Sequence, residues 1–177
     1  MMMRMNCIFL DFDGVINNWY CFYGVAKENA LVLKKIIALS NAKIVVTASS
    51  KYSIQRENCD FYKSDYYNTY VKRLNELGIE IYDLTPMGEN RSSEIKKYLL
   101  EHDVNEYVII DDDLVDKDLQ DHQVFLDLYR GLQEEHITPV LRILSGKLGF
   151  YPKDYNRDET PSELCLRINK YYNEKKK

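Results

Sequence analysis

The sequence has no long apolar run, few cysteines and little net charge. Each of these absences excludes a class of protein. No stretch of the 177 residues approaches the ~20 apolar residues of a membrane span, and the start, MMMRMN, lacks the apolar core of a signal peptide. We therefore expect a soluble cytoplasmic protein. The four cysteines include no CxxC pair, which argues against a zinc cluster and a disulfide framework. A formal net charge of −4 gives no general attraction to nucleic acid, so such binding would need a local patch.

What the sequence does contain is ordinary globular composition, with 45% hydrophobic and 29% charged residues. We expect one domain over residues 1–177, with its core at about 6–145. Apolar and β-branched runs predict strands at 7–10, 42–48, 79–84, 107–110 and 124–127. Amphipathic patterns predict helices at 27–40, 71–77, 92–102, about 138–144 and 161–172, the last closing the chain.

The first predicted strand ends in two acids, Asp11 and Asp13, followed by Gly14. Ligands of an open parallel sheet bind beyond the carboxyl ends of its strands, so these side chains are expected in a site. A turn at Gly14 would let one carboxylate act as a nucleophile and the other serve a leaving-group oxygen. A solvated acidic turn is the alternative, made less favourable by the buried run before it.

The second predicted strand ends in Thr47, Ala48, Ser49 and Ser50. A threonine hydroxyl at a strand end, followed by backbone N–H groups that enter a helix, can cradle a phosphoryl oxygen. The same residues in isolation are more often a helix cap. Their position after a second buried strand favours the cradle.

The fourth predicted strand ends in Asp111, Asp112 and Asp113. Two carboxylates ~4 Å apart repel by roughly 4 kcal/mol at an effective dielectric of ~20, so acids here that face Asp11 call for a cation between them. Magnesium fits, because it prefers oxygen ligands and no histidine or cysteine follows these strands. An acidic loop without metal is the alternative.

Arg91 stands at the start of the helix before that strand, with Ser92 as the expected N-cap. A surface arginine is the alternative interpretation. Pro139 favours a late start for the following helix, with Thr138 as its cap. The three histidines are dispersed and are interpreted as structural or surface residues. Four tyrosines near one another could stack bases, although packing of a helix onto the sheet is the favoured interpretation: Tyr62, Tyr66, Tyr67 and Tyr70.

Four motifs in order resemble those of the haloacid dehalogenase (HAD) superfamily over about residues 6–145. FLDFDGV resembles its first motif, hhhDxDG[TV], and Thr47 with Ala48 its second. Arg91 stands where the third motif has a basic residue, more often lysine, so Lys96 or Lys97 could serve instead. The run YVIIDDD resembles the fourth, hhhhDD. RSSEIKKYLL, YVIIDDD and RGLQEEHI look closest to the small HAD family linked to RNA-repair proteins.

The resemblance implies an α/β fold, a three-layer α/β/α Rossmann-like core with a mostly parallel five-stranded sheet. It implies a Mg²⁺-dependent phosphomonoester hydrolase in which Asp11 is the nucleophile and Asp13 the acid and base. Thr47, Ala48 and Arg91 would hold the phosphoryl oxygens. Asp11, the Asp13 carbonyl and Asp111 would hold the metal, with Asp112 supporting it through water and Asp116 as a weaker candidate.

Both intervals in which HAD enzymes insert cap domains are short here, 16–43 and 84–91, and residues 16–26 are expected to form a loop or flap. An open site suits a phosphate on a large molecule, such as a nucleic-acid end, and does not exclude small phosphorylated substrates. The alternative from another class is a non-catalytic module that binds phosphate or nucleic-acid ends. The intact pair of Asp11 and Asp13 argues against it.

Overall fold

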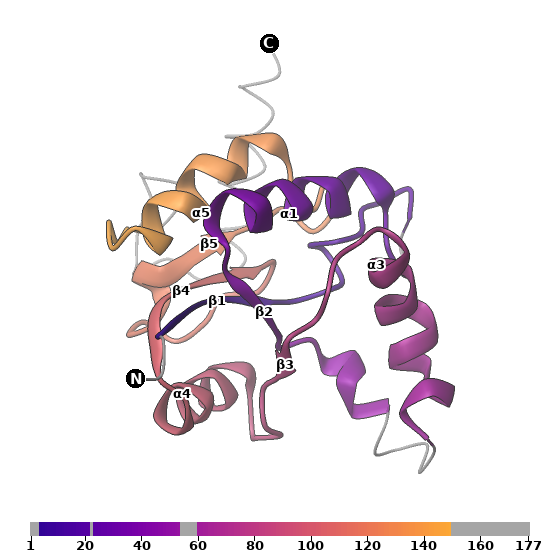
Figure 1. Ribbon diagram of the computed structural model, residues 1–177, viewed down its shortest axis with the longest axis horizontal. Helices are drawn as coiled ribbons and strands as arrows, with labels where there is room; N and C mark the ends of the chain where they lie inside the picture. Colours follow the sequence, from indigo (N-terminus) through magenta and orange to yellow (C-terminus); the bar gives the residue numbers. More distant parts are fainter. Residues whose placement is uncertain (1–3, 22, 54–59, 150–177) are drawn as a thin grey trace.

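Five parallel strands form one sheet in the order β3-β2-β1-β4-β5 (Figure 1). The computed structural model describes residues 4–21, 23–53 and 60–149. This sheet, with helices on both faces, is the predicted Rossmann-like α/β fold. Its strands are β1 (Met5–Leu10), β2 (Lys43–Val46), β3 (Asp83–Leu84), β4 (Val104–Asp111) and β5 (Gln123–Phe125).

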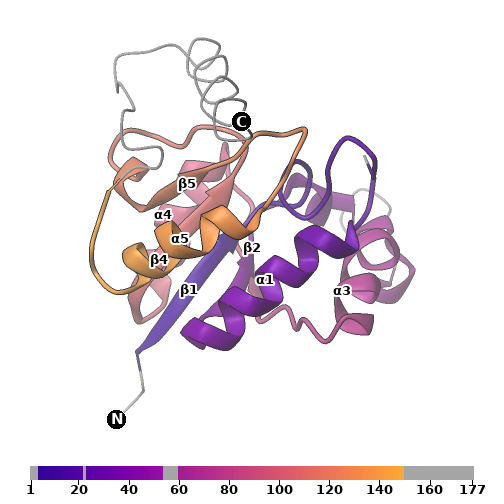
Figure 2. The same ribbon diagram turned by 90° about the horizontal axis from the view of Figure 1, so that it is seen from above.

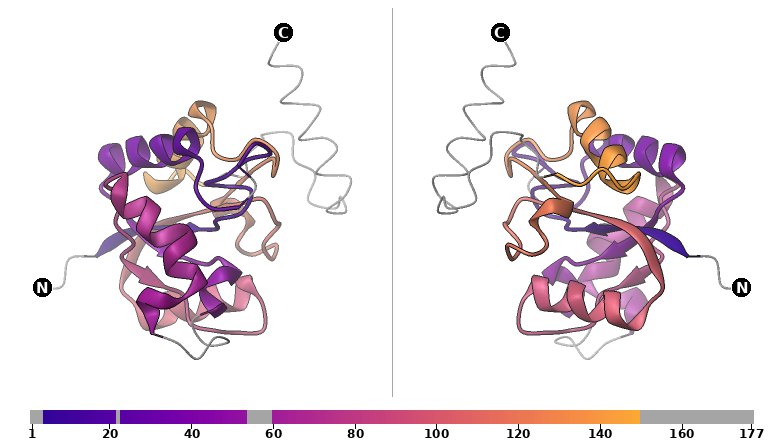
Figure 3. Two further views of the ribbon diagram at one scale, coloured as in Figure 1. Left: turned by 90° about the vertical axis from the view of Figure 1, so that its right-hand side faces the viewer. Right: turned by 90° about the vertical axis from the view of Figure 1, so that its left-hand side faces the viewer.

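Helices cover both faces of the sheet. Helices α1 (Lys27–Ser40) and α5 (Ile137–Leu144) lie over one face, and α4 (Arg91–Glu101) lies over the other (Figures 1 and 2). The two side views of Figure 3 show the strands between these layers. Successive side chains of a strand point to opposite faces, so a strand buried on both sides is apolar throughout. Strand β1 follows this rule, since its last four residues are fully buried.

Alternate residues of β1 belong to different cores. Leu10 packs in a cluster with Leu33 of α1, whereas Phe9 packs in another with Tyr98 of α4. The Phe9 and Tyr98 rings meet edge to face, with centroids 5.6 Å apart. Burial on both faces fixes the strand register, and the register sets which residues meet at the edge of the sheet.

The register brings the ends of three strands level with one another. Leu10 pairs with Val46 of β2 and with Ile110 of β4. The next residues along the chain, Asp11, Thr47 and Asp111, therefore lie at the same carboxyl edge of the sheet. The parallel pairing of β1 with β2 and β4 produces this arrangement, and no single strand would produce it alone.

A further helical segment lies beside this carboxyl edge. A π-helical stretch, Tyr67–Val71, continues into α3 (Lys72–Glu76). Tyr66 and Tyr70 stack on Phe12, with ring centroids 5.8 and 4.6 Å apart. Packing of these two tyrosines is therefore confirmed. Short 3₁₀ turns complete the described chain at Ser49–Tyr52, Phe61–Lys63, Gln120–His122 and Glu134–His136.

Several predicted boundaries were wrong by a few residues. Only Asp83 and Leu84 form the third strand, and the amide of Ile79 instead bonds the Leu74 carbonyl at the end of α3. Asn90, not Ser92, caps α4, and its side chain accepts from the Ser93 N–H. Strand β5 is Gln123–Phe125 rather than 124–127.

Helix α5 begins at Ile137, so Thr138 is not its cap. Pro139 lies in the first turn, where its missing N–H breaks no helical hydrogen bond. The helix predicted at 161–172 lies outside the described residues, so a single domain over 1–177 stays a prediction. Within the described residues, 4–21, 23–53 and 60–149, no helix has the length and apolarity to cross a membrane.

Candidate active site

The loop after β1 presents two aspartates in different ways. Asp11 is buried, whereas Asp13 is exposed at the mouth of the site. The Asn17 side chain fixes the loop, because its Oδ1 accepts from the Gly14 N–H at 2.8 Å and its Nδ2 donates to Asp13 Oδ1 at 2.7 Å. The Tyr70 hydroxyl donates to the same Asp13 oxygen at 2.9 Å. Asp13 is thus held in one orientation by two donors.

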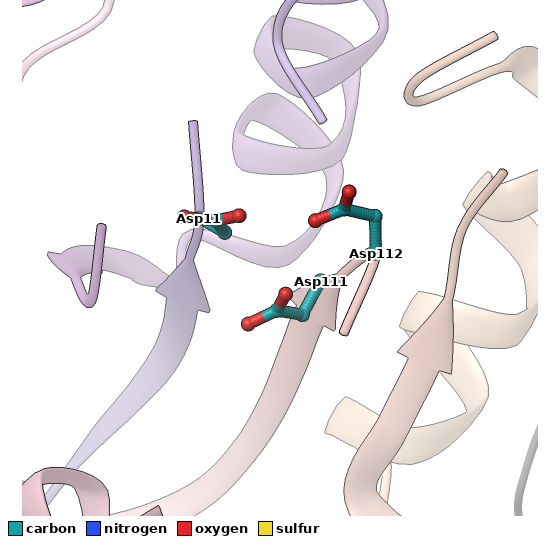
Figure 4. A group of neighbouring side chains, drawn as sticks. All are labelled: Asp11, Asp111 and Asp112. Carbon is teal, nitrogen blue, oxygen red and sulfur yellow. The ribbon is translucent and has the colours of Figure 1, made fainter. Parts of the chain in front are cut away.

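Three carboxylates from β1 and β4 converge. Asp11, Asp111 and Asp112 each offer an oxygen within 4.8 Å of the other two. Figure 4 shows the carboxylates of Asp11, of Asp111 at the end of β4 and of the following Asp112 around a common gap. Oxygen ligands at this spacing fit a hard divalent cation such as Mg²⁺.

The protein environment disfavours three negative charges in this gap. Burial raises the pKa of Asp11, although Arg91 opposes the effect. Burial and the charge of Asp11 raise the pKa of Asp111 well above its usual range. Burial, followed by the charges of Asp11 and Asp113, raises the pKa of Asp112 to about 8. A bound cation would reverse these shifts, because it favours the ionised carboxylates.

Gly14 is required by this packing. Its φ is +74°, and a Cβ at this position would lie 2.4 Å from Asp112 Oδ2. A left-handed backbone and a close carboxylate both demand glycine. The glycine of the first motif therefore makes room for an acid of the fourth.

Arg91 joins the two acidic strand ends. Its Nη1 donates to both oxygens of Asp111 at 2.7 and 2.6 Å, and its Nη2 donates to Asp11 Oδ1 at 3.2 Å. Burial lowers the pKa of the guanidinium, but the charges of Asp111 and Asp11 outweigh this and raise the pKa above its ordinary value. Arg91 stays positively charged and offsets part of the acidic cluster.

Two hydroxyls after β2 have unused hydrogen-bonding capacity. Thr47 Oγ1 and Ser50 Oγ are buried and have no partner among the residues that the structure describes. Buried hydroxyls normally have a partner in the protein or in a ligand. Ala48 follows Thr47 and caps the 3₁₀ turn Ser49–Tyr52. Both hydroxyls are available to phosphoryl or substrate oxygens.

A buried ion pair contacts the backbone of the segment that follows β2. Lys51 Nζ lies 2.6 Å from Glu94 Oε2 and also donates to the Thr47 carbonyl at 3.2 Å. Both side chains are only 2% exposed. The Glu94 carboxylate also accepts from Tyr52, from the Gly88 N–H and from the Thr85 hydroxyl. This cluster joins α4 to the backbone that carries Thr47.

A cavity of about 340 Å³ opens beside Asp13. Its walls carry three tyrosines, two serines and two carboxylates. We call it the tyrosine pocket, and its lining residues are Asp13, Tyr23, Ser49, Ser50, Tyr52, Asp65 and Tyr70.

A comparison with known families agrees with this geometry. Residues 7–137 match the sequence model of the family described as the HAD domain in Swiss Army Knife RNA repair proteins. The chain belongs to this family. None of the curated proteins and none of the solved structures matches the chain significantly. Its family membership makes the chain a HAD domain of phosphohydrolase type, a class that acts on phosphorylated substrates and generally uses Mg²⁺.

The HAD domain brings most of the predicted site residues to one edge of the sheet, as the register and contacts above show. Several of the alternatives lie elsewhere. Asp116 forms a surface pair with Lys96 at 2.9 Å. Asp113 lies nearer, with its Oδ2 4.0 Å from Arg91 Nη1, but its side chain is 84% exposed. Lys97 is also exposed. The geometry therefore favours Arg91 over the nearby lysines.

Four side chains shape the site of the HAD domain although the sequence did not predict a role for them there. They are Asn17, Lys51, Glu94 and the hydroxyl of Tyr70. Tyr70 belongs to the tyrosine group predicted to pack a helix onto the sheet, and packing alone does not predict that its hydroxyl bonds Asp13. Lys51 and Glu94 have opposite charges in two separate elements, and no local pattern indicates that they are paired and buried.

Proposed function

We propose that this HAD domain is a Mg²⁺-dependent phosphomonoester hydrolase that works through an aspartyl-phosphate, with nucleotide or polynucleotide-end phosphates as substrates. The observation that carries the proposal is the convergence of Asp11, Asp111 and Asp112 within 4.8 Å, with Arg91 bonded to two of them. Asp11, the Asp13 carbonyl and Asp111 would hold the metal, with Asp112 supporting it through water. When bound, Mg²⁺ supplies positive charge that offsets the phosphoryl oxygens.

In the first step, an oxygen of Asp11 attacks phosphorus and the bond to the leaving oxygen breaks. Asp13 gives its proton to that oxygen, which departs as an alcohol. Tyr70 and Asn17 both bond Oδ1 of Asp13, and among the described residues Oδ2 has no partner, so Oδ2 is the oxygen suited to carry the proton. Thr47, Ala48 and Arg91 hold the remaining phosphoryl oxygens.

In the second step, Asp13 takes a proton from water and the hydroxide attacks phosphorus. The bond between phosphorus and Asp11 breaks, which releases phosphate and restores the Asp11 carboxylate. Arg91 balances charge in both steps, because it stays protonated and bonds Asp11 directly.

Release of phosphate from p-nitrophenyl phosphate in the presence of Mg²⁺ tests the proposal. We expect turnover that chelation removes and that Asp11→Asn abolishes. Asp118→Asn is the matched control, because Asp118 is an exposed acid that pairs with Lys96 away from the site. Full activity in Asp11→Asn would refute the nucleophile, and phosphate binding without turnover by the unmodified protein would favour the non-catalytic module.

The family description supports polynucleotide ends as substrates, because it names RNA repair proteins. Oligonucleotides with a 3′- or 5′-phosphate should be compared with mononucleotides. Equal or better turnover of mononucleotides would contradict the polynucleotide part of the proposal and leave the hydrolase part intact.

A further inference from the structure

The tyrosine pocket lies on the side of the site where a leaving group departs. Asp13 is one of its lining residues. A general acid must lie within ~2.6–3.2 Å of the oxygen that it protonates. The group attached to that oxygen therefore extends from Asp13 into the pocket, if Asp13 has the role given under the proposed function.

The pocket presents fixed aromatic surface. Tyr70 is buried and stacked on Phe12, so its ring cannot turn away. Tyr23 is 62% exposed, yet its hydroxyl is tied to Asp65 and its ring meets Tyr70 edge to face with centroids 6.0 Å apart. Because these two contacts already restrict the Tyr23 ring, the ring loses little conformational freedom when a flat ligand stacks on it.

Polar groups suited to a sugar line the same pocket. The Asp65 carboxylate already accepts from the Tyr23 and Thr69 hydroxyls. Each carboxylate oxygen can accept more than one hydrogen bond, so Asp65 can also accept from a sugar hydroxyl, as acidic residues do from ribose in nucleotide sites. Ser50 Oγ is buried without a partner among the described residues, so it is available to a ligand. The pocket volume of about 340 Å³ is near the lower limit for small-molecule sites, so the pocket suits a single nucleoside-sized group.

We propose that the tyrosine pocket binds the leaving group and favours a nucleoside over a plain sugar or aliphatic alcohol. This inference rests on the proposed function and names the unit that bears the scissile phosphate. In a polynucleotide, that unit is the terminal nucleoside. Tyr23 supplies the stacking surface, and Asp65 with Ser50 supplies the polar contacts.

Adenosine 5′-monophosphate and ribose 5-phosphate are the probes, because both release a ribose 5-hydroxyl and they differ at C1, which carries adenine in the first and a hydroxyl in the second. We expect kcat/KM for the nucleotide to be about tenfold higher, mainly through KM, as one stacked base provides. In Tyr23→Leu the ratio should fall toward one. Tyr23→Phe keeps the ring and loses only the bond to Asp65, so it should keep most of the ratio. Tyr82→Leu is the matched control, because Tyr82 is 54% exposed and lies outside the pocket.

A ratio near one in the unmodified protein would overturn the proposal, as would equal effects of Tyr23→Leu and Tyr82→Leu. Thermal unfolding of each variant checks that it is folded. If no phosphate ester is hydrolysed, the proposed function fails, and the pocket is tested by equilibrium dialysis with adenosine and ribose. Adenosine binding that Tyr23→Leu weakens supports the pocket, and no preference for adenosine refutes it.

Discussion

Replacing Lys51 with methionine should lower the free energy of unfolding by more than the loss of a single hydrogen bond would. The change leaves the Glu94 carboxylate buried without its cation, and breaking a buried pair in this way costs ~3–5 kcal/mol. Glu94 keeps three donors, from Tyr52, Gly88 and Thr85, so we expect a loss near the lower limit, about 3 kcal/mol. Burial already lowers the pKa of Lys51, which indicates that the pair itself contributes little net stability.

Thermal and urea unfolding measure the effect. A loss of about 3 kcal/mol corresponds to a fall in Tm of about 6–12 °C for a protein of this size. Lys35→Met is the matched control, because it breaks an ion pair with Glu134 whose side chains are 59% and 63% exposed. We expect no measurable change in that variant.

A double variant separates the buried charge from lost packing. Adding Glu94→Gln to Lys51→Met removes the uncompensated carboxylate and keeps an acceptor for the remaining donors. The double variant should therefore be more stable than Lys51→Met alone. Additive losses in the double variant, or equal stabilities for Lys51→Met and Lys35→Met, would refute the reasoning.

Three further predictions concern the site and the core. Arg91→Met removes three charge-assisted hydrogen bonds to Asp111 and Asp11, so activity should fall by about 10²–10³ and unfolding free energy without metal by about 3 kcal/mol. Mg²⁺ should restore part of that stability, and an equal loss with and without Mg²⁺ in thermal unfolding would contradict this. Gly14→Ala should weaken Mg²⁺ binding in calorimetry, because its Cβ would meet Asp112 at 2.4 Å. Gly146→Ala is the control, because its φ is +82° and its nearest atom is the end of the Glu106 side chain, 3.3 Å away and outside the site. Burial lowers the pKa of His136 from 6.5 to about 3, so between these values the unfolded chain binds a proton that the folded chain does not. Stability should therefore fall by up to about 1.4 kcal/mol per unit as pH drops through this window, and His136→Gln should reduce the slope in urea unfolding at a series of pH values.

Local hydrophobic patterns in the sequence predict much of the fold. Strand β1 is apolar because both of its faces are buried, and α1 has the predicted bounds because its buried stripe repeats at helical spacing. The acids after β1 and β4 indicate a site at one edge of the sheet, because the carboxyl ends of parallel strands meet at the same edge and ligands bind there. Sequence reasoning fails where ends are set by competition for hydrogen bonds, as at the Asn90 cap and the two-residue β3.

The sequence by itself determined the parallel α/β class and the strand-end residues Asp11, Thr47 and Asp111. Only the tertiary structure decided that Arg91 bonds two of these acids, that Lys51 meets Glu94 and that Tyr70 turns its hydroxyl to Asp13. The physical reason is the range of the forces involved. Hydrophobic periodicity repeats over a few residues and can be read locally. These contacts join residues 20 to 80 positions apart and depend on packing between elements.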